Sequence, residues 1–154
     1  MNRLFSLSDL TWAFPAIRER RQGYFCTSVI SGVGRWIKAS PEGVREEFAE
    51  VRLQAEPGNS FEVQLGHAWP WSVRIEDRDA LDEALLKGVI DAILRPRLHV
   101  HQCRIVTTGV DCRPGATAVK AVGLAAALAV ADMLQRGGWD GDDDAHAAAA
   151  AKRV

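Results

Sequence analysis

The fold is decided by residues 48–58, which read Phe-Ala-Glu-Val-Arg-Leu-Gln-Ala-Glu-Pro-Gly. From Val51 to Glu56, apolar side chains alternate with charged or polar ones, which is typical of a β-strand with one buried face. The strand must end at Pro57-Gly58-Asn59, because this combination favours a turn. Alternation then resumes over residues 61–65. The sequence therefore predicts two strands separated by a turn.

Two more strands are predicted before this stretch. Residues 24–30 and 33–39 are rich in β-forming side chains, and Ser31-Gly32 between them is a short-turn signal, so we expect a hairpin. Residues 40–43, Ser-Pro-Glu-Gly, predict a second turn. We expect these first four strands to form an antiparallel sheet.

The hydrophobic period changes at Asp77. Leu81, Leu85, Val89 and Ile93 then recur at helical spacing, which predicts an amphipathic helix ending before Pro96. Residues 98–106 alternate again and predict a fifth strand, followed by a loop over 107–115. The alanine-rich stretch from about 116 to 135 predicts a second helix able to lie close on a sheet, ended by Gly137-Gly138.

The order of elements, ββββαβα, predicts an α/β fold of the α+β kind. We expect a two-layer sandwich with a mainly antiparallel sheet of four to five strands and both helices on one face. Residues 1–22 are predicted to be an N-terminal helical arm, with a helix over 7–21 interrupted by Pro15. Residues 23–138 form the predicted domain, and 139–154 a disordered, acidic and alanine-rich tail.

Composition limits the classes of function. The 154 residues suffice for one domain, and 19 Lys and Arg balance 20 Asp and Glu, so nucleic acid could be bound only through a local patch. The three cysteines have no CxxC spacing and no apolar stretch reaches a membrane span, which indicates a cytoplasmic protein with reduced thiols. No cofactor and no membrane partner are predicted.

A spaced series of residues follows a known family pattern over about 90 residues. The matching positions in the strands and their loop are Lys38, Ser40, Gly43, Arg45, Phe48, Val51, Leu53, Glu56 and Pro57. Those in the helices are Ala84, Lys87, Gly88, Val89, Ala92 and Lys120. The series resembles domain IV of elongation factor G, and this resemblance implies the ribosomal protein S5 domain 2-like fold.

The resemblance also implies a partner, which is RNA or the ribosome. The residues expected to make this contact are Lys38, Arg45, Arg113 and Lys120. The chain departs from the family pattern in its loop over 107–115, which lacks histidine and keeps only Asp111 as a counterpart, and in Pro41-Glu42, which replace glycines. The phosphate-binding GxxxxGKS/T loop is absent, so we expect no GTPase activity.

Two other classes of function stay open. The first is a small enzyme whose pocket is lined by His67, Trp69, Trp71, His99, His101 and Asp111, with Cys112 as a candidate nucleophile. Alternatively, the two tryptophans plug the end of the core and Cys112 is an ordinary thiol. The second class is a homo-oligomeric protein-interaction component, which five tryptophans and a nearly neutral charge favour.

A metal site is a further alternative. His99, His101 and Cys103 have the spacing that places three side chains on one face of a strand, where they could ligate a metal. The simpler interpretation is a half-exposed polar face of a sheet, because no flanking pair of ligands completes the set.

Overall fold

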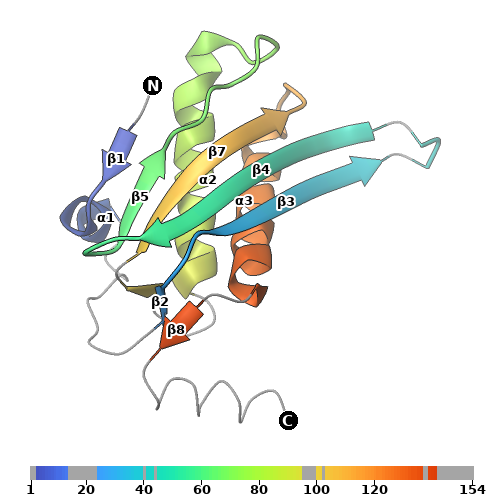
Figure 1. Ribbon diagram of the computed structural model, residues 1–154. Helices are drawn as coiled ribbons and strands as arrows, with labels where there is room; N and C mark the ends of the chain where they lie inside the picture. The colour runs from blue at the N-terminus through green and yellow to red at the C-terminus, as the bar shows by residue number, and fades with distance from the viewer. Residues whose placement is uncertain are drawn as a thin grey trace.

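The computed structural model describes residues 3–13, 24–39, 41–43, 45–94, 100–101, 103–136 and 139–141. These residues form two sheets and three helices, and the predicted α+β sandwich is confirmed (Figure 1). In chain order the elements are β1 (Arg3–Phe5), α1 (Leu7–Ala13), β2 (Tyr24–Cys26), β3 (Ile30–Ala39), β4 (Arg45–Pro57), β5 (Glu62–Leu65), α2 (Ile75–Leu94), β6 (Val100–His101), β7 (Cys103–Cys112), α3 (Ala118–Gln135) and β8 (Trp139–Gly141).

The larger sheet has the strand order β1-β5-β7-β4-β3. Its pairs are antiparallel except β5 with β7, which run parallel. The sequence predicted four consecutive antiparallel strands, but β7 lies between β4 and β5. Helix α2 returns the chain from the end of β5 to the start of β7, which is the long connection that parallel neighbours require. Strands β6, β2 and β8 form a separate small sheet.

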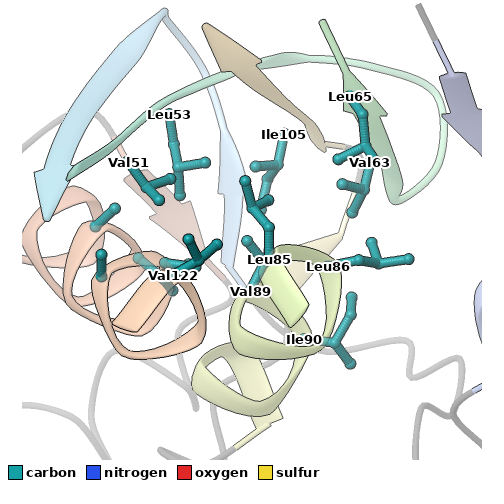
Figure 2. Packing of buried hydrophobic residues seen from close by; sticks show 14 of the residues in the cluster. Val51, Leu53, Val63, Leu65, Leu85, Leu86, Val89, Ile90, Ile105 and Val122 are labelled. Carbon is teal, nitrogen blue, oxygen red and sulfur yellow. The ribbon is translucent and has the colours of Figure 1, made fainter. Parts of the chain in front are cut away.

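The core lies between the larger sheet and helices α2 and α3, which cover the same face of it (Figures 1 and 2). Most inward positions of the strands are apolar, as the alternation predicted, and the exceptions among the described residues include Glu47 and Thr107. The residues that meet there are Val51, Leu53, Val63, Leu65 and Ile105 from the strands, and Leu85, Leu86, Val89, Ile90 and Val122 from the helices. All are buried.

The predicted hairpin around Ser31-Gly32 is wrong, because β3 runs without interruption through both residues. Its glycines serve close packing. A methyl group at Gly32 would lie 2.5 Å from the carbonyl oxygen of Ala129, and one at Gly34 would overlap the carbonyl oxygen of Ala125. Helix α3 therefore approaches the backbone of β3 where side chains are missing. The hairpin that does form joins β3 to β4 through the turn that contains Gly43.

Strand β3 forms one outer edge of the sheet, and α3 also touches that edge through a side chain. The backbone N–H of Val33 donates a hydrogen bond of 2.9 Å to the Asp132 carboxylate. Arg136 donates to the same oxygen at 3.0 Å. The hydrogen bonds from Val33 and Arg136 hold the pKa of Asp132 below its usual value.

Strand β7 is longer than predicted, because residues 107–112 continue the strand and the loop begins only at Arg113. In β4, Leu53 pairs with Thr107 and Arg52 with Gly109, so Thr108 is an extra residue that forms a β-bulge. The bulge changes which positions face inward. Residues 103, 105 and 107 are buried before it, and Cys112 is buried after it. Strict alternation therefore fails as a guide across Thr108.

Both ends of the chain add strands that the sequence did not predict. Strand β1 pairs with β5, and helix α1 places Leu10 in the core with no exposed surface. The N-terminal segment is thus part of the packed domain, while the rest of the predicted helix, 14–21, lies outside the described residues. Strand β8 pairs with β2, so the predicted disordered tail is wrong for residues 139–141. Residues 142–154 also lie outside the described residues.

Within the described residues, α3 is the one helix long and apolar enough to suit a membrane span by length and composition. It packs against β3 and β4 and buries Ala121, Val122, Ala125 and Ala129 there. The expectation of a packed core helix is therefore confirmed.

Candidate functional site

Three strands meet where the β3–β4 hairpin extends beyond the helices, at a place that we call the hairpin end. Lys38 on β3 pairs with Glu47 on β4, and Arg45 pairs with Ala39. The chain leaves β7 beside them, since Ala49 pairs with Cys112 and the N–H of Arg113 donates to the carbonyl of Phe48 at 2.9 Å. The structure thus places Lys38, Arg45 and Arg113 at one end of the larger sheet, although Arg113 is far from the other two in the sequence.

Helix α3 is joined to the hairpin end by Glu47. This carboxylate is 6% exposed and accepts a hydrogen bond of 2.8 Å from the indole of Trp36. The Lys120 ammonium lies 3.9 Å from its other oxygen. A buried carboxylate needs such partners, since an unpaired charge would be costly there. The contact places Lys120 beside Glu47, which pairs with Lys38 across the two strands.

The hairpin end has a mixed charge rather than a continuous basic surface. Lys38 and Arg113 are exposed, and so are Glu42 in the turn and Asp111 near the end of β7. Glu47 is buried against its partners and faces inward. An anion here would meet separate cations with acidic neighbours, so its binding should be sensitive to position and to salt.

A cleft of about 540 Å³ opens beside the hairpin end, between α2 and the loop that follows β7. Arg74, Asp77, Pro114 and Gly115 are among its lining residues. Gly115 has a φ of 151°, which favours glycine. Arg74 and Asp77 form an ion pair, in which Nε of Arg74 lies 3.1 Å from Oδ2 of Asp77, three residues further along the chain.

Cys112 also lines this cleft, but it is 3% exposed. Burial and the neighbouring charge of Asp111 raise the pKa of its thiol to about 11. The thiolate that a nucleophile needs is therefore scarce at neutral pH. This environment fits an ordinary buried thiol.

A second polar cluster, formed by His67, Asp82, Thr107 and Trp69, lies near the start of α2. The His67 ring is held at both nitrogens, with Nδ1 2.6 Å from the Thr107 hydroxyl and Nε2 2.7 Å from Asp82. The indole of Trp69 donates to the same Asp82 oxygen at 2.8 Å. Burial opposes ionisation of Asp82, but the hydrogen bonds from His67 and Trp69 hold its pKa below the usual value.

The tautomer of His67 follows from its partners. A carboxylate only accepts, so Nε2 carries a proton toward Asp82. In a neutral ring, Nδ1 must then accept from the Thr107 hydroxyl, whose oxygen receives the N–H of Gly66 at 3.0 Å. Thr107 has no exposed surface and the His67 side chain is 2% exposed. The cluster therefore fixes the loop before α2 onto β7 and offers no substrate access at Thr107.

The residues predicted to line an enzyme pocket are described only in part. His67 and Trp69 meet, but Trp71 is 99% exposed and Asp111 is at the hairpin end. His99 lies outside the described residues, as does the side chain of His101. Cys103 is wholly buried and hydrogen-bonded to the thiol of Cys26. Among the residues whose positions are described, no group of three potential metal ligands occurs.

Sequence reasoning missed Glu47, Thr107 and Asp82. The first two carried a signal, because Glu47 is in phase with Ala49 and Val51, and Thr107 with Cys103 and Ile105. A polar residue at an inward position of a strand needs a buried partner. Asp82 carried none, because it stands among acids that suit the start of a helix. Such a position suits a solvated carboxylate, but the Asp82 side chain is only 16% exposed.

Comparison with known proteins shows the fold alone. No protein-family model and no curated protein sequence matches the chain. The structure is similar to the crystal structure of a protein from Thermus thermophilus, ttk003000868, with a TM-score of 0.57 and 17% identity. The match covers 77% of this chain and 18% of the other, so the chain spans less than a fifth of that protein.

Proposed function

We propose that this protein is a domain IV-like module that binds RNA or a ribonucleoprotein at the hairpin end, without GTPase activity, in the cytoplasm. One observation carries the proposal. Lys38, Arg45, Arg113 and Lys120, the residues expected to contact RNA, belong to four different segments that lie at this end of the sheet. On the open face of the sheet, the described arginines Arg35, Arg52 and Arg104 are each paired with a carboxylate, whereas Lys38 and Arg113 are exposed.

The chemistry of these residues suits phosphate. Lysine offers a point charge and arginine a planar fork of donors, and both contact phosphates without reading the base sequence. The nearby Glu42 and Asp111 would repel a phosphate that approaches from the wrong side. We therefore expect modest, salt-dependent affinity and dependence on the shape of the RNA.

The structural likeness adds support of a different kind. A fold that also forms less than a fifth of a longer protein is one that can act as a module. Residues of the domain IV pattern, including Phe48, Val51 and Leu53, occupy β4, which lies between β7 and β3 in the sheet. The proposal thus rests on two features, the similarity to domain IV and the cations at the hairpin end.

The test is the double variant Lys38→Gln/Arg113→Gln, which leaves the contact of Lys120 with buried Glu47 intact. We would measure binding of a labelled RNA hairpin, and of purified small ribosomal subunits, at several salt concentrations. Loss of two phosphate contacts should reduce the slope of log K against log salt by about 1.4 to 1.8. Affinity at low salt should fall about tenfold or more.

The matched control is Lys87→Gln/Arg136→Gln, which removes the same charge from α2 and from the far end of α3. It should bind like the natural protein. Equal losses in both double variants would mean general charge attraction, and absence of binding by the natural protein at low salt would overturn the proposal.

A further inference from the structure

The outward face of α3 is apolar, which is unusual for a helix on the surface. Its described outward positions include Val119, Leu124, Ala127 and Leu128, and the only charge among residues 119–131 is Lys120. Val119 and Leu128 remain 47% and 44% exposed. A helix that is apolar on all sides is normally covered on all sides. The outer surface of the helical layer therefore lacks a covering partner among the described residues of the single chain.

A groove of about 490 Å³ runs along this surface between α2 and α3. Its floor consists of small residues, Ala84, Gly88, Gly123 and Ala127. The helices touch closely there, because a methyl group at Gly88 would overlap the carbonyl oxygen of Gly123. Such a floor lets the backbone of another helix approach closely, as small residues do in other helix–helix contacts.

The charges at the rim decide what fits the groove. On α2 they alternate in sign at helical spacing, as Glu83, Lys87 and Asp91, and α3 adds Lys120. Two acids and two bases give no net charge. A nucleic acid would meet two carboxylates, and a strongly charged peptide would meet two charges of its own sign. In a two-fold symmetric contact, the same surface of both copies must be complementary to itself. A rim on which acids and bases alternate meets this requirement, because the acids of one copy can face the bases of the other.

We propose that the α2–α3 face is a homodimer interface, in which the outer surfaces of two helical layers pack against each other. The size of the face is adequate. Helices of 20 and 18 residues are about 30 Å long, and side by side about 20 Å wide, so the face covers about 600 Å² in projection. A standard interface buries about 800 Å² of accessible surface per partner, which is the same order. The proposal does not depend on RNA binding.

The test is sedimentation velocity of the natural protein over roughly a hundredfold range of concentration, together with Ala84→Glu and Ala127→Glu. Each substitution places a carboxylate on the groove floor, and in a symmetric dimer each occurs twice. We expect a dimer whose Kd increases about tenfold or more in each variant. The matched control, Ile37→Glu, makes the same kind of change at a half-exposed residue on the opposite face of the sheet and should leave the Kd unchanged.

Circular dichroism would show that the variants fold. Should one fail to fold, hydrogen exchange of the natural protein supplies the second measurement. On dilution, the amide exchange rates of residues 119–128 should increase more than those of β3. A natural protein that stays monomeric over the whole range overturns the proposal, and so does a dimer that both groove variants preserve. Faster exchange elsewhere on dilution, without change in α2 and α3, would also overturn it.

Discussion

The two faces of the larger sheet make different kinds of contact, close packing on the covered face and ion pairs on the open face. On the covered face, α3 lies so close to β3 that Gly32 and Gly34 have no room for a side chain. On the open face, charged side chains form ion pairs both along a strand and between strands. Glu50 binds Arg35 and Arg52 at 2.7 and 2.8 Å, and Arg104 lies between Glu56 and Glu62 at 3.7 and 3.6 Å. The free energy of unfolding should therefore depend strongly on atoms added to or removed from the covered face. It should depend little on the charges of the open face.

Gly34→Val should have the largest effect, because its side chain would overlap the Ala125 backbone. We expect the free energy of unfolding to fall by about 3 kcal/mol or more, as for severe overpacking. Urea denaturation followed by circular dichroism measures it. The neighbouring change Val33→Thr, on the open face, should cost less than about 0.5 kcal/mol. If Gly34→Val matched the natural protein, the close contact between β3 and α3 would be wrong.

Asp82→Asn should come next, with a loss of about 2 kcal/mol at neutral pH, since Asp82 as an anion accepts from both His67 and Trp69. The folded pKa of Asp82 is lowered, so its stabilisation is present above the unfolded pKa of about 3.9 and is lost as pH falls through the folded pKa. The variant should therefore lose less stability on acidification than the natural protein. Urea titrations at several pH values would show this, and an unchanged pH slope would refute it.

Thr107→Val tests the other side of the same cluster. It keeps the shape but removes the hydroxyl that binds His67 and the N–H of Gly66, so we expect a loss of about 1 to 2 kcal/mol. The control is Thr108→Val at the bulge, whose exposed hydroxyl makes one bond of 3.3 Å to Arg52 and should contribute less. NMR of the His67 ring would detect the lost contact directly. Equal losses at both positions would contradict the difference between the faces.

Glu50→Gln should have the smallest effect. Hydrogen bonds from Arg52 and Arg35 lower the pKa of Glu50, but these arginines are largely exposed. The loss should be less than about 1 kcal/mol. Repeating the urea titration near 1 M salt, where the Debye length is about 3 Å, should remove most of the difference between variant and natural protein. A loss as large as that of Asp82→Asn would show that the open face is not screened.

The sequence predicted the parts of the fold in which burial alone sets the pattern. The alternation of Val51, Leu53 and Ala55 and the helical spacing of Leu81, Leu85 and Val89 both proved correct. Errors arose where one residue type serves two purposes. Gly32 looked like a turn but makes room for α3, and Gly109 looked like a loop but follows a bulge. A single chain pattern contains neither the position of a neighbouring helix nor the register of a partner strand.

The candidate site was less predictable for the same reason. Lys38, Arg45 and Lys120 were nominated by family resemblance, since no local spacing connects them with one another or with Arg113. That Lys38, Arg45 and Arg113 lie at one end of the sheet depends on the register of β3, β4 and β7. Trp69 and Trp71, both expected beside His67, are close in sequence but face different surroundings, because Trp69 is buried and Trp71 is exposed.

The hydrogen bond between Val33 and Asp132 has a consequence for association. An unpaired strand edge can recruit the strand of another chain, and β3 is the long edge of this sheet. By occupying the N–H of Val33, the Asp132 side chain removes one donor that an incoming strand would use. An incoming strand would therefore find one donor fewer on this edge, and acid that protonates Asp132 should weaken this effect.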